Sequence, residues 1–384
     1  MEIAGGLYRE VCESPAWDAQ YGSGGRAAAA ISNLSPGSTL HTYVFDEHSD
    51  GISHLQALGI NIQSYPTTEQ IAFAYFHPLS RPHIEPPISL LKPLPSLKVS
   101  GGTVLRFGFL EGDAIINAER AIYDPQTSRL PQPFSANGSQ TKELALVLNE
   151  SELSSAANTL DIDVGAKKLM LEQDASVVIV KAGARGATVY ERNGIRNHVP
   201  AYRSESVFKI GTGDVFSSIF AFHWGEAGCS AKEAADLASR AVASYCSTRQ
   251  LPASTQAVEQ QRPINTRTPK PILLDGAVST IGRRYTLEEA RFRLEELGAS
   301  VICPVLGDGW NSYSKNDVGA ILLIMDGVSP DKIDNTLNSY ALPLTVLAED
   351  SPDKIFSGVK SSSLTITGDF SSALYFAVWS AMSN

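Results

Sequence analysis

Residues 210–220 read IGTGDVFSSIF, and they form the most informative stretch of the chain. Gly211 and Gly213 permit a tight turn whose backbone N–H groups point into one space, and the apolar run that continues to Trp224 predicts a helix whose positive end lies at the same point. Such a loop can hold an anion. Asp214 lies where a carboxylate can take a proton from a hydroxyl while the amides stabilise a transferred phosphoryl group. The alternative is an ordinary turn with an N-capping aspartate.

Other stretches of the first 250 residues carry similar signals, and each has a local alternative. Asn149 and Glu152 are three residues apart and can simply cap a helix. Lys181 can be a solvated residue at a strand end, and the glycines of residues 22–25 can form a flexible loop. The stretches are LVLNESE (146–152), VVIVKAGARGA (177–187), YDP (123–125), GSGG (22–25) before an alanine-rich helix, and residues 57–75.

Together these stretches resemble the ribokinase-like, PfkB-type carbohydrate and nucleoside kinases over most of residues 1–250. The resemblance implies an α/β fold, a ribokinase-like parallel-sheet sandwich with a small lid. It implies that Asp214 is the catalytic base and that Gly211, Thr212 and Gly213 form an anion hole. In phosphoryl transfer the protein mainly positions the reactants and neutralises charge.

The resemblance also implies ATP and Mg²⁺ as cofactors and assigns roles to further residues. Asn149 and Glu152 organise the magnesium and phosphate region, with Glu152 holding the metal through water. The residues expected near the nucleotide phosphates are Lys181, Gly183, Arg185 and Gly186. The residues expected near the substrate are Glu10, Gly24, Gly25, Arg26 and Lys209.

The chain departs from the family pattern where the family binds its substrate. Phe208 and Lys209 stand in place of the usual Asp-Thr before the glycine loop, and Arg26 replaces the usual asparagine. Glu10 takes the place of a shorter aspartate that grips sugar hydroxyls. Arg26 and Lys209 would add positive charge and favour an anionic substrate; the alternative is that they face solvent or pair with Glu10.

Composition excludes several other classes of protein. The chain has 384 residues with 43% hydrophobic and 19% charged residues, which is typical of soluble globular proteins. Its net charge of −10 argues against a nucleic-acid partner. The four cysteines lack the spacing of a zinc site or a disulfide framework, and no signal peptide or long apolar run is evident, so we expect reduced thiols and a cytoplasmic protein without membrane contact.

The chain is expected to divide into two domains. Residues 251–271, rich in Pro, Thr and Gln, predict a linker between a kinase-like domain at 1–250 and a smaller Rossmann-like α/β domain at 272–384. In the second domain Thr286 and Glu289 predict a capping box that opens a helix ending at Gly298. The predicted strands are 272–274, 301–305, 320–325 and 344–347, and the apolar helix at 374–382 is expected to be core or a dimer contact.

The second domain weakly resembles the nucleoside 2-deoxyribosyltransferases and their Rossmann-like relatives, in ILLDGAVST (272–280), ILLIMDGVSPDKIDNT (321–336) and LPLTVL (342–347). The family's nucleophilic Glu has no counterpart in residues 334–340. Asp275, Asp326 and Asp334 are candidates to bind ribose hydroxyls at strand ends, or they are turn and cap residues.

Three functions follow from these patterns. The first is ATP-dependent phosphorylation of a sugar or nucleoside hydroxyl, with a C-terminal nucleoside- or nucleotide-binding domain. The second is a catalytically degenerate, kinase-like sensor that binds a nucleotide or sugar. The third is cleavage of nucleosides or ribosyl transfer by the C-terminal domain.

Overall fold

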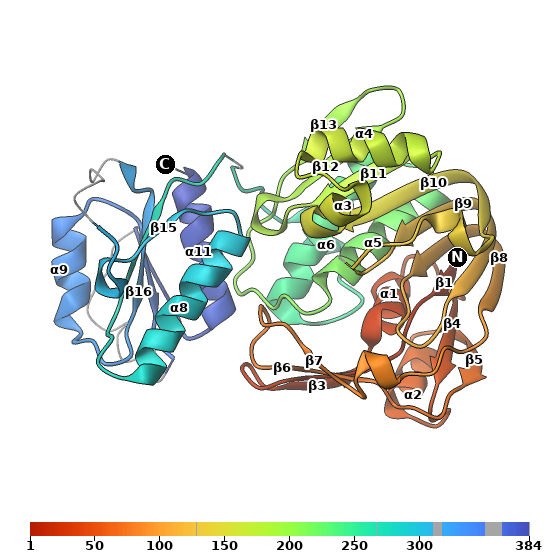
Figure 1. Ribbon diagram of the computed structural model, residues 1–384, viewed down its shortest axis with the longest axis horizontal. Coiled ribbons are helices and arrows are strands. Elements are labelled where there is room, and N and C mark those ends of the chain that lie inside the picture. The colour runs from red at the N-terminus through yellow and green to blue at the C-terminus, as the bar shows by residue number, and fades with distance from the viewer. Residues whose placement is uncertain (128, 266, 310–316, 350–362, 384) are drawn as a thin grey trace. The chain divides into compact units, whose positions relative to one another are not determined.

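The computed structural model describes residues 1–127, 129–265, 267–309, 317–349 and 363–383. The chain folds as two compact units (Figure 1). Unit 1 comprises Met1–Ala182, Gly186–Ser204 and Lys209–Arg262, and unit 2 comprises Gly183–Arg185, Glu205–Phe208 and Pro263–Asn384. Within the stretch expected to be a linker, Thr255–Glu259 form the short helix α7.

A nine-stranded sheet organises unit 1, in the order β13-β12-β11-β10-β9-β8-β1-β4-β5. All neighbouring strands pair in parallel except β12 and β13, which complete the β11 edge as antiparallel strands. The strands are β1 (Glu2–Ala4), β4 (Thr39–Val44), β5 (Asn61–Pro66), β8 (Leu97–Phe107), β9 (Ala114–Asp124), β10 (Gln140–Asn149), β11 (Val177–Lys181), β12 (Ala187–Glu191) and β13 (Arg196–Val199).

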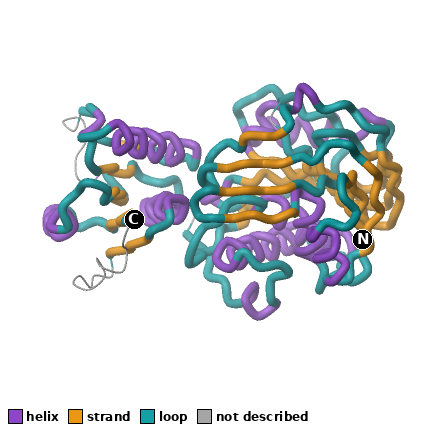
Figure 2. The backbone as a smooth tube through the Cα atoms, turned by 90° about the horizontal axis from the view of Figure 1, so that it is seen from below, coloured by secondary structure: helices purple, strands orange, loops and turns teal. Residues whose placement is uncertain are grey.

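Helices cover this sheet because both of its faces are apolar. Leu146, Leu148 and Val178 belong to one core cluster with α3 and α4, while the alternate residues Val147 and Ile179 are equally buried on the other face. Helix α5 packs on α1 and α6, and α3 packs on α4. Figure 2 shows helices on both sides of the strands of this unit. The helices of unit 1 are α1 (Gly22–Ile31), α2 (Asp50–Ala57), α3 (Glu150–Ala157), α4 (Ile162–Glu172), α5 (Thr212–Phe220), α6 (Ala231–Thr248) and α7.

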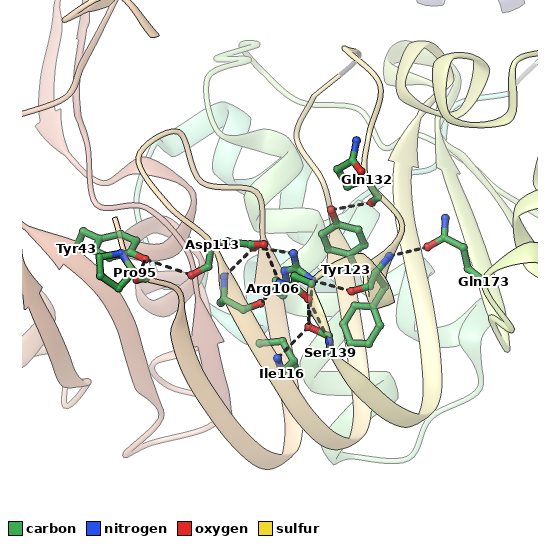
Figure 3. A network of polar contacts seen from close by, with 12 residues as sticks. Tyr43, Pro95, Arg106, Asp113, Ile116, Tyr123, Gln132, Ser139 and Gln173 are labelled. Atoms are coloured by element: carbon green, nitrogen blue, oxygen red, sulfur yellow. Dashed lines mark hydrogen bonds and ion pairs between the residues drawn. The ribbon is translucent and has the colours of Figure 1, made fainter. Parts of the chain in front are cut away.

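The strands β8 and β9 are bent. They pair in parallel from their first residues onward, yet only residues 108–113 connect them and no crossover helix intervenes. A straight strand as long as β8 would span about 33 Å, whereas the connection can reach at most about 25 Å. The strand must therefore turn back toward its own start, and the pairing is interrupted at Gly102. The bend of neighbouring strands is visible in Figure 3.

A buried arginine ties the ends of these bent strands together (Figure 3). Arg106 donates to Asp113 Oδ1 at 2.6 Å, to the Phe134 carbonyl at 3.0 Å and to Ser139 Oγ at 3.3 Å. Its guanidinium also lies over the Tyr123 ring, 4.7 Å from the centroid. The residues before β9 and β10 are thereby held against β8.

A separate four-stranded sheet, in the order β3-β2-β6-β7, forms the small lid. Its strands are β2 (Arg9–Cys12), β3 (Trp17–Gln20), β6 (Ala72–Tyr75) and β7 (His83–Glu85). The chain enters the lid directly after β1 and leaves it into α1, so residues of β2 lie close to the start of α1. The expected fold class, a parallel-sheet α/β unit with a lid, is confirmed.

Unit 2 contains five parallel strands in the order β15-β14-β16-β17-β18. Its described elements are β14 (Ile272–Asp275), α8 (Ile281–Glu296), β15 (Val301–Ile302), β16 (Ala320–Ile324), α9 (Asp331–Ser339), β17 (Leu344–Leu347), β18 (Leu364–Thr367) and α11 (Phe370–Ser383). This is one of the two common doubly wound orders, so the second α/β fold is also present.

Two predictions for unit 2 are wrong in detail. Helix α8 begins five residues before Thr286, because Thr280 caps it through Arg283 N, and the Thr286 hydroxyl instead donates to the Gly282 carbonyl inside the helix. The strand expected at 301–305 ends at Ile302, since Pro304 starts a short 3-10 turn. The C-terminal helix α11 is core, with Leu374 and Trp379 buried.

Cys12, Cys246 and Cys303 are buried and Cys229 is half-buried, and none of these four described residues forms a disulfide. Throughout the described segments, the helices are too short or too polar to cross a membrane.

Candidate active site

The glycine loop has the geometry expected of an anion-binding turn. Gly211 adopts φ +76°, a left-handed conformation, and α5 begins at Thr212. Asp214 is therefore the third residue of the helix, and its side chain does not cap the helix. The ordinary-cap alternative for Asp214 is wrong, so its carboxylate is available for other contacts.

The side chain of Arg26 fills the space beside this loop. It is fully buried, and its guanidinium donates to Asp214 Oδ2 at 3.1 Å, to Glu10 Oε1 at 2.8 Å and to Glu10 Oε2. Its Nε donates to Tyr245 Oη at 3.2 Å. We call Arg26 with Glu10 and Asp214 the arginine clamp. Burial lowers the pKa of Arg26, but Glu10 and Asp214 outweigh burial and raise this pKa well above its ordinary value.

Glycines make room for the clamp. A Cβ at Gly211 would lie 2.0 Å from Arg26 Nε, so no other residue fits there without displacing the guanidinium. On the other side, a Cβ at Gly24 would lie 2.5 Å from the Gly5 carbonyl oxygen. Gly24 thus lets α1 start against the end of β1, which places Arg26, two residues further on, within reach of Asp214.

Both oxygens of Asp214 accept hydrogen bonds. Gln126 Nε2 donates to Oδ1 at 2.6 Å, opposite the contact from Arg26. Burial raises the pKa of Asp214 to about 6; Arg26 opposes this shift, and Glu10 and Asp124 add to it. An aspartate with this pKa changes its protonation state close to neutral pH, as a general base requires.

A second ion pair lies next to the clamp. Lys181 Nζ, at the end of β11, donates to Asp124 Oδ2 at 2.6 Å, and Ser217 Oγ of α5 donates to the same oxygen at 2.7 Å. The other oxygen of Asp124 is buried and has no hydrogen-bond partner among the described residues. A Cβ at Gly213 would lie 3.5 Å from Lys181 Nζ, so Lys181 faces the glycine loop.

Asn149 and Glu152 form a capping box at the start of α3. Asn149 Oδ1 accepts from Glu152 N, and Glu152 Oε2 accepts from Asn149 N, each at 2.8 Å. Glu152 is nonetheless close to the ion pair: burial, followed by the charge of Asp124, raises the pKa of Glu152 to about 7, and Lys181 opposes the shift. The pair thus caps a helix and also presents a carboxyl group to the site.

Lys209 completes the positive side of the loop. Its Nζ donates to Thr212 Oγ1 at 2.8 Å, in the first turn of α5. Burial, together with the positive charge of Lys181, lowers the pKa of Lys209. Two ammonium groups and the N-terminus of α5 therefore converge near Gly213, where an anion would relieve their mutual repulsion.

The acidic groups of the site suit a magnesium ion shared with phosphate. Mg²⁺ is usually held by one or two carboxylates together with waters and substrate phosphates. The unpartnered oxygen of Asp124 and the adjacent Glu152 supply such a pair. In the described parts of the chain no group of three or more acidic, His or Cys side chains could hold a metal alone. These residues therefore suit a metal ion that binds together with a phosphate group.

Not all predicted residues lie together. Glu10, Arg26, Lys181, Lys209 and Asp214 meet in unit 1, as described above. Gly24 and Gly25 lie in α1. Gly186 lies just before β12 and has φ +85°, and a Cβ there would lie 2.1 Å from the Val199 carbonyl oxygen. Gly183 and Arg185 belong instead to unit 2.

In unit 2, two of the three candidate aspartates follow neighbouring strands. Asp275 ends β14 and binds Lys332 Nζ at 2.9 Å; Asp326 follows β16 and binds Arg283 Nε at 3.2 Å. Asp334 lies apart, in the exposed part of α9. A nucleoside site in this unit stays a prediction.

Sequence reasoning missed Asp124, Gln126 and Tyr245 as members of the site. Asp124 stood in the quoted YDP stretch, and its position at the carboxyl end of a parallel strand next to β10 was a usable signal. Gln126 has φ +53° and Tyr245 lies far along α6, so only the fold shows that they reach Asp214 and Arg26.

Comparison with known proteins agrees with this description. Residues 140–256 match the model of the pfkB family carbohydrate kinases. Ribokinase from Giardia lamblia has a similar fold, with 16% identity and a TM-score of 0.51, over 67% of this chain and 98% of that one. No curated protein matches the chain in sequence.

Two more structures match the same 67% of the chain. Ribokinase from Thermotoga maritima has 18% sequence identity and a TM-score of 0.48, with 97% of its own length covered. A nucleoside kinase from Methanocaldococcus jannaschii has 15% sequence identity and a TM-score of 0.48, also with 97% of its length covered. The family-model match over residues 140–256 and the fold shared with the Giardia ribokinase over about two thirds of the chain confirm the resemblance to the PfkB-type kinases.

Proposed function

We propose that unit 1 transfers a phosphoryl group from ATP to a hydroxyl of a sugar or nucleoside. One observation carries the proposal: Asp214, buried and with a pKa near 6, lies in the first turn of α5 beside Lys181 and Lys209. A base and a cluster of positive charge are thus held at the same end of one helix.

In this proposal Asp214 accepts the proton of the acceptor hydroxyl. The backbone N–H groups of residues 211–213, with Lys181 and Lys209, stabilise the charge on the transferred group. Asp214 can receive a proton at the second lone pair of either oxygen, or at an oxygen that Arg26 or Gln126 leaves. Binding of the acceptor hydroxyl in place of Gln126 requires the smaller change, because Arg26 is held by Glu10 as well.

Asp124 and Glu152 would hold Mg²⁺, which when bound neutralises phosphate charge. Lys181 already neutralises one oxygen of Asp124, which leaves the other oxygen free to face the metal. Glu152 binds a metal only when it is deprotonated, so its raised pKa makes binding depend on pH near neutrality.

The test is ADP release from ATP and Mg²⁺ against a panel of free sugars, sugar phosphates and nucleosides. Asp214→Asn should abolish acceptor-dependent release while keeping the fold. Asp236→Asn is the matched control, since this aspartate lies in α6, pairs with Arg240 and takes no part in the site. Equal activity in both variants would remove Asp214 as the base.

A second function, binding without turnover, is favoured by one observation: both oxygens of Asp214 are already engaged. In that case calorimetry should detect binding of a nucleotide or sugar to the wild-type full chain, while the same protein releases no ADP with any acceptor. The same panel therefore separates the two functions.

For unit 2 we retain a nucleoside- or nucleotide-binding role as the proposal. Asp275 and Asp326 support it, because they follow the strands on either side of the point where the strand order reverses. Titration of the full chain with adenosine tests this role. Asp326→Asn should weaken the binding, and unchanged affinity would count against this site.

A further inference from the structure

A cavity of about 650 Å³ lies beside the lid and is lined by residues of β3 and α2. Figure 1 labels these two elements. This volume is in the usual range for small-molecule sites. The side chains that matter to its chemistry are those of Arg9, Asp18, Gln20, Tyr21, Ser49, His54 and Gln70. None of them belongs to the residues assigned above to phosphoryl transfer.

Two side chains of the lining, Arg9 and Gln20, lie on the face of the lid opposite Glu10, while Ala19 and Tyr21 also line the cavity. Arg9 pairs with Gln20 across β2 and β3, and Glu10 pairs with Ala19. Since successive side chains of a strand point to opposite faces, Arg9 and Gln20 point away from the face on which Glu10 holds Arg26. A ligand held by Arg9 and Gln20 would therefore meet the lid from the face opposite Glu10.

The charges of the lining disfavour an anion. The guanidinium of Arg9 is occupied by Asp18, with Nε to Oδ1 at 3.0 Å and Nη2 to Oδ2 at 2.6 Å. Asp50 adds a second carboxylate to the lining, and no other Lys or Arg lines the cavity. A phosphate would meet more negative than available positive charge.

The remaining groups suit a ligand with several hydroxyls. Amides, hydroxyls and imidazole both donate and accept hydrogen bonds, as hydroxyls do. The Ser49 hydroxyl oxygen is buried and lacks a partner in the described segments, although Ser49 stands at the N-cap of α2. Tyr21 Oη lies 3.3 Å from His54 Nε2, so both groups are fixed at the edge of the cavity.

We propose that this cavity is a second binding site, for a neutral polyhydroxy compound of the free sugar or polyol class. The site is separate from phosphoryl transfer and does not depend on it. Tyr21 is left intact in the test because its ring also contacts the clamp, with Arg26 Cζ 5.2 Å from the ring centroid.

The test is titration of the full chain with D-ribose, D-glucose and myo-inositol at millimolar concentrations, followed by ligand-observed NMR and calorimetry. The double variant His54→Ala/Gln70→Ala alters two exposed side chains of the lining. It should weaken binding of at least one of these compounds tenfold or more, with an unchanged melting temperature. Asp214→Asn should leave that binding as in the wild type.

Three results would overturn the proposal. The first is that none of the three compounds binds. The second is that Asp214→Asn removes the binding while the double variant does not, which would place the ligand at the candidate active site. The third is that inorganic phosphate binds more tightly than all three compounds and is lost in the double variant, which contradicts the ligand class.

Discussion

Replacing Arg26 with methionine should destabilise the chain strongly. Methionine has a similar length and no charge, so the substitution leaves Glu10 and Asp214 facing each other without their shared partner. Both carboxylates are almost entirely buried, at 5% and 8% exposure. Methionine also cannot replace the hydrogen bond to Tyr245.

Removing one member of a buried ion pair typically costs about 3–5 kcal/mol, because the remaining charge is left uncompensated. Arg26 serves two carboxylates, so we expect a loss in the upper part of this range. Domains are usually stable by only about 5–15 kcal/mol. The matched control is Arg9→Met: this neighbouring arginine of the lid also pairs with an aspartate, but both side chains are half exposed, and we expect no measurable change.

The assay is urea unfolding of the full chain, followed by tryptophan fluorescence and far-UV circular dichroism, with each transition fitted separately because two units need not unfold together. A triple variant, Arg26→Met with Glu10→Gln and Asp214→Asn, should recover most of the loss, since no buried charge then lacks a partner. The reasoning is refuted if Arg26→Met shifts no transition further than Arg9→Met does, or if the triple variant is no more stable than the single one.

Four further outcomes are expected. Gly211→Ala should lower the melting temperature more than Gly37→Ala, because both residues have similar φ, +76° and +79°, but only the first Cβ meets the arginine clamp; equal shifts would contradict this. The wild type should lose stability as pH rises from 4.5 to about 7, because the folded state holds the proton of the Glu152 carboxyl group more tightly than the unfolded state does. Glu152→Gln should reduce this loss, and urea unfolding at a series of pH values measures it. Asn149→Ala should cost about 1 kcal/mol by calorimetry, and Asn149→Ser, which can still cap α3, should restore it. If Asp214 is the base, the rate of ADP release should rise with pH up to about 6 and then level off, and a flat profile would exclude that role.

The fold of unit 1 could be predicted because its signals are local. The glycine loop, the strand before Lys181 and the apolar pattern of α6 each fix one element, and their order fixes the topology. The start of α8 was misplaced because two threonines, Thr280 and Thr286, both offer a capping hydroxyl. Local sequence does not decide between them, whereas packing of the whole helix does.

The contacts of the candidate site were less accessible from sequence. The positive charge of Arg26 was visible, but its neutralisation by Glu10 and Asp214 depends on three elements far apart in the chain meeting at one point. Gln126 reaches Asp214 only because the chain turns sharply after β9. Such pairings are set by tertiary structure and leave no periodic pattern.

The bent strands have a consequence for the way this protein folds. Parallel sheets usually form slowly, since a helix must be placed before two strands can meet. Here Leu97 pairs with Ala114 and Asn117 pairs with Gln140, at chain separations of roughly 20 residues. Loops this short close quickly. Residues 97–149 are thus expected to act as an early nucleus onto which β1 and β11 dock, and substitutions in this segment should slow refolding more than they speed unfolding.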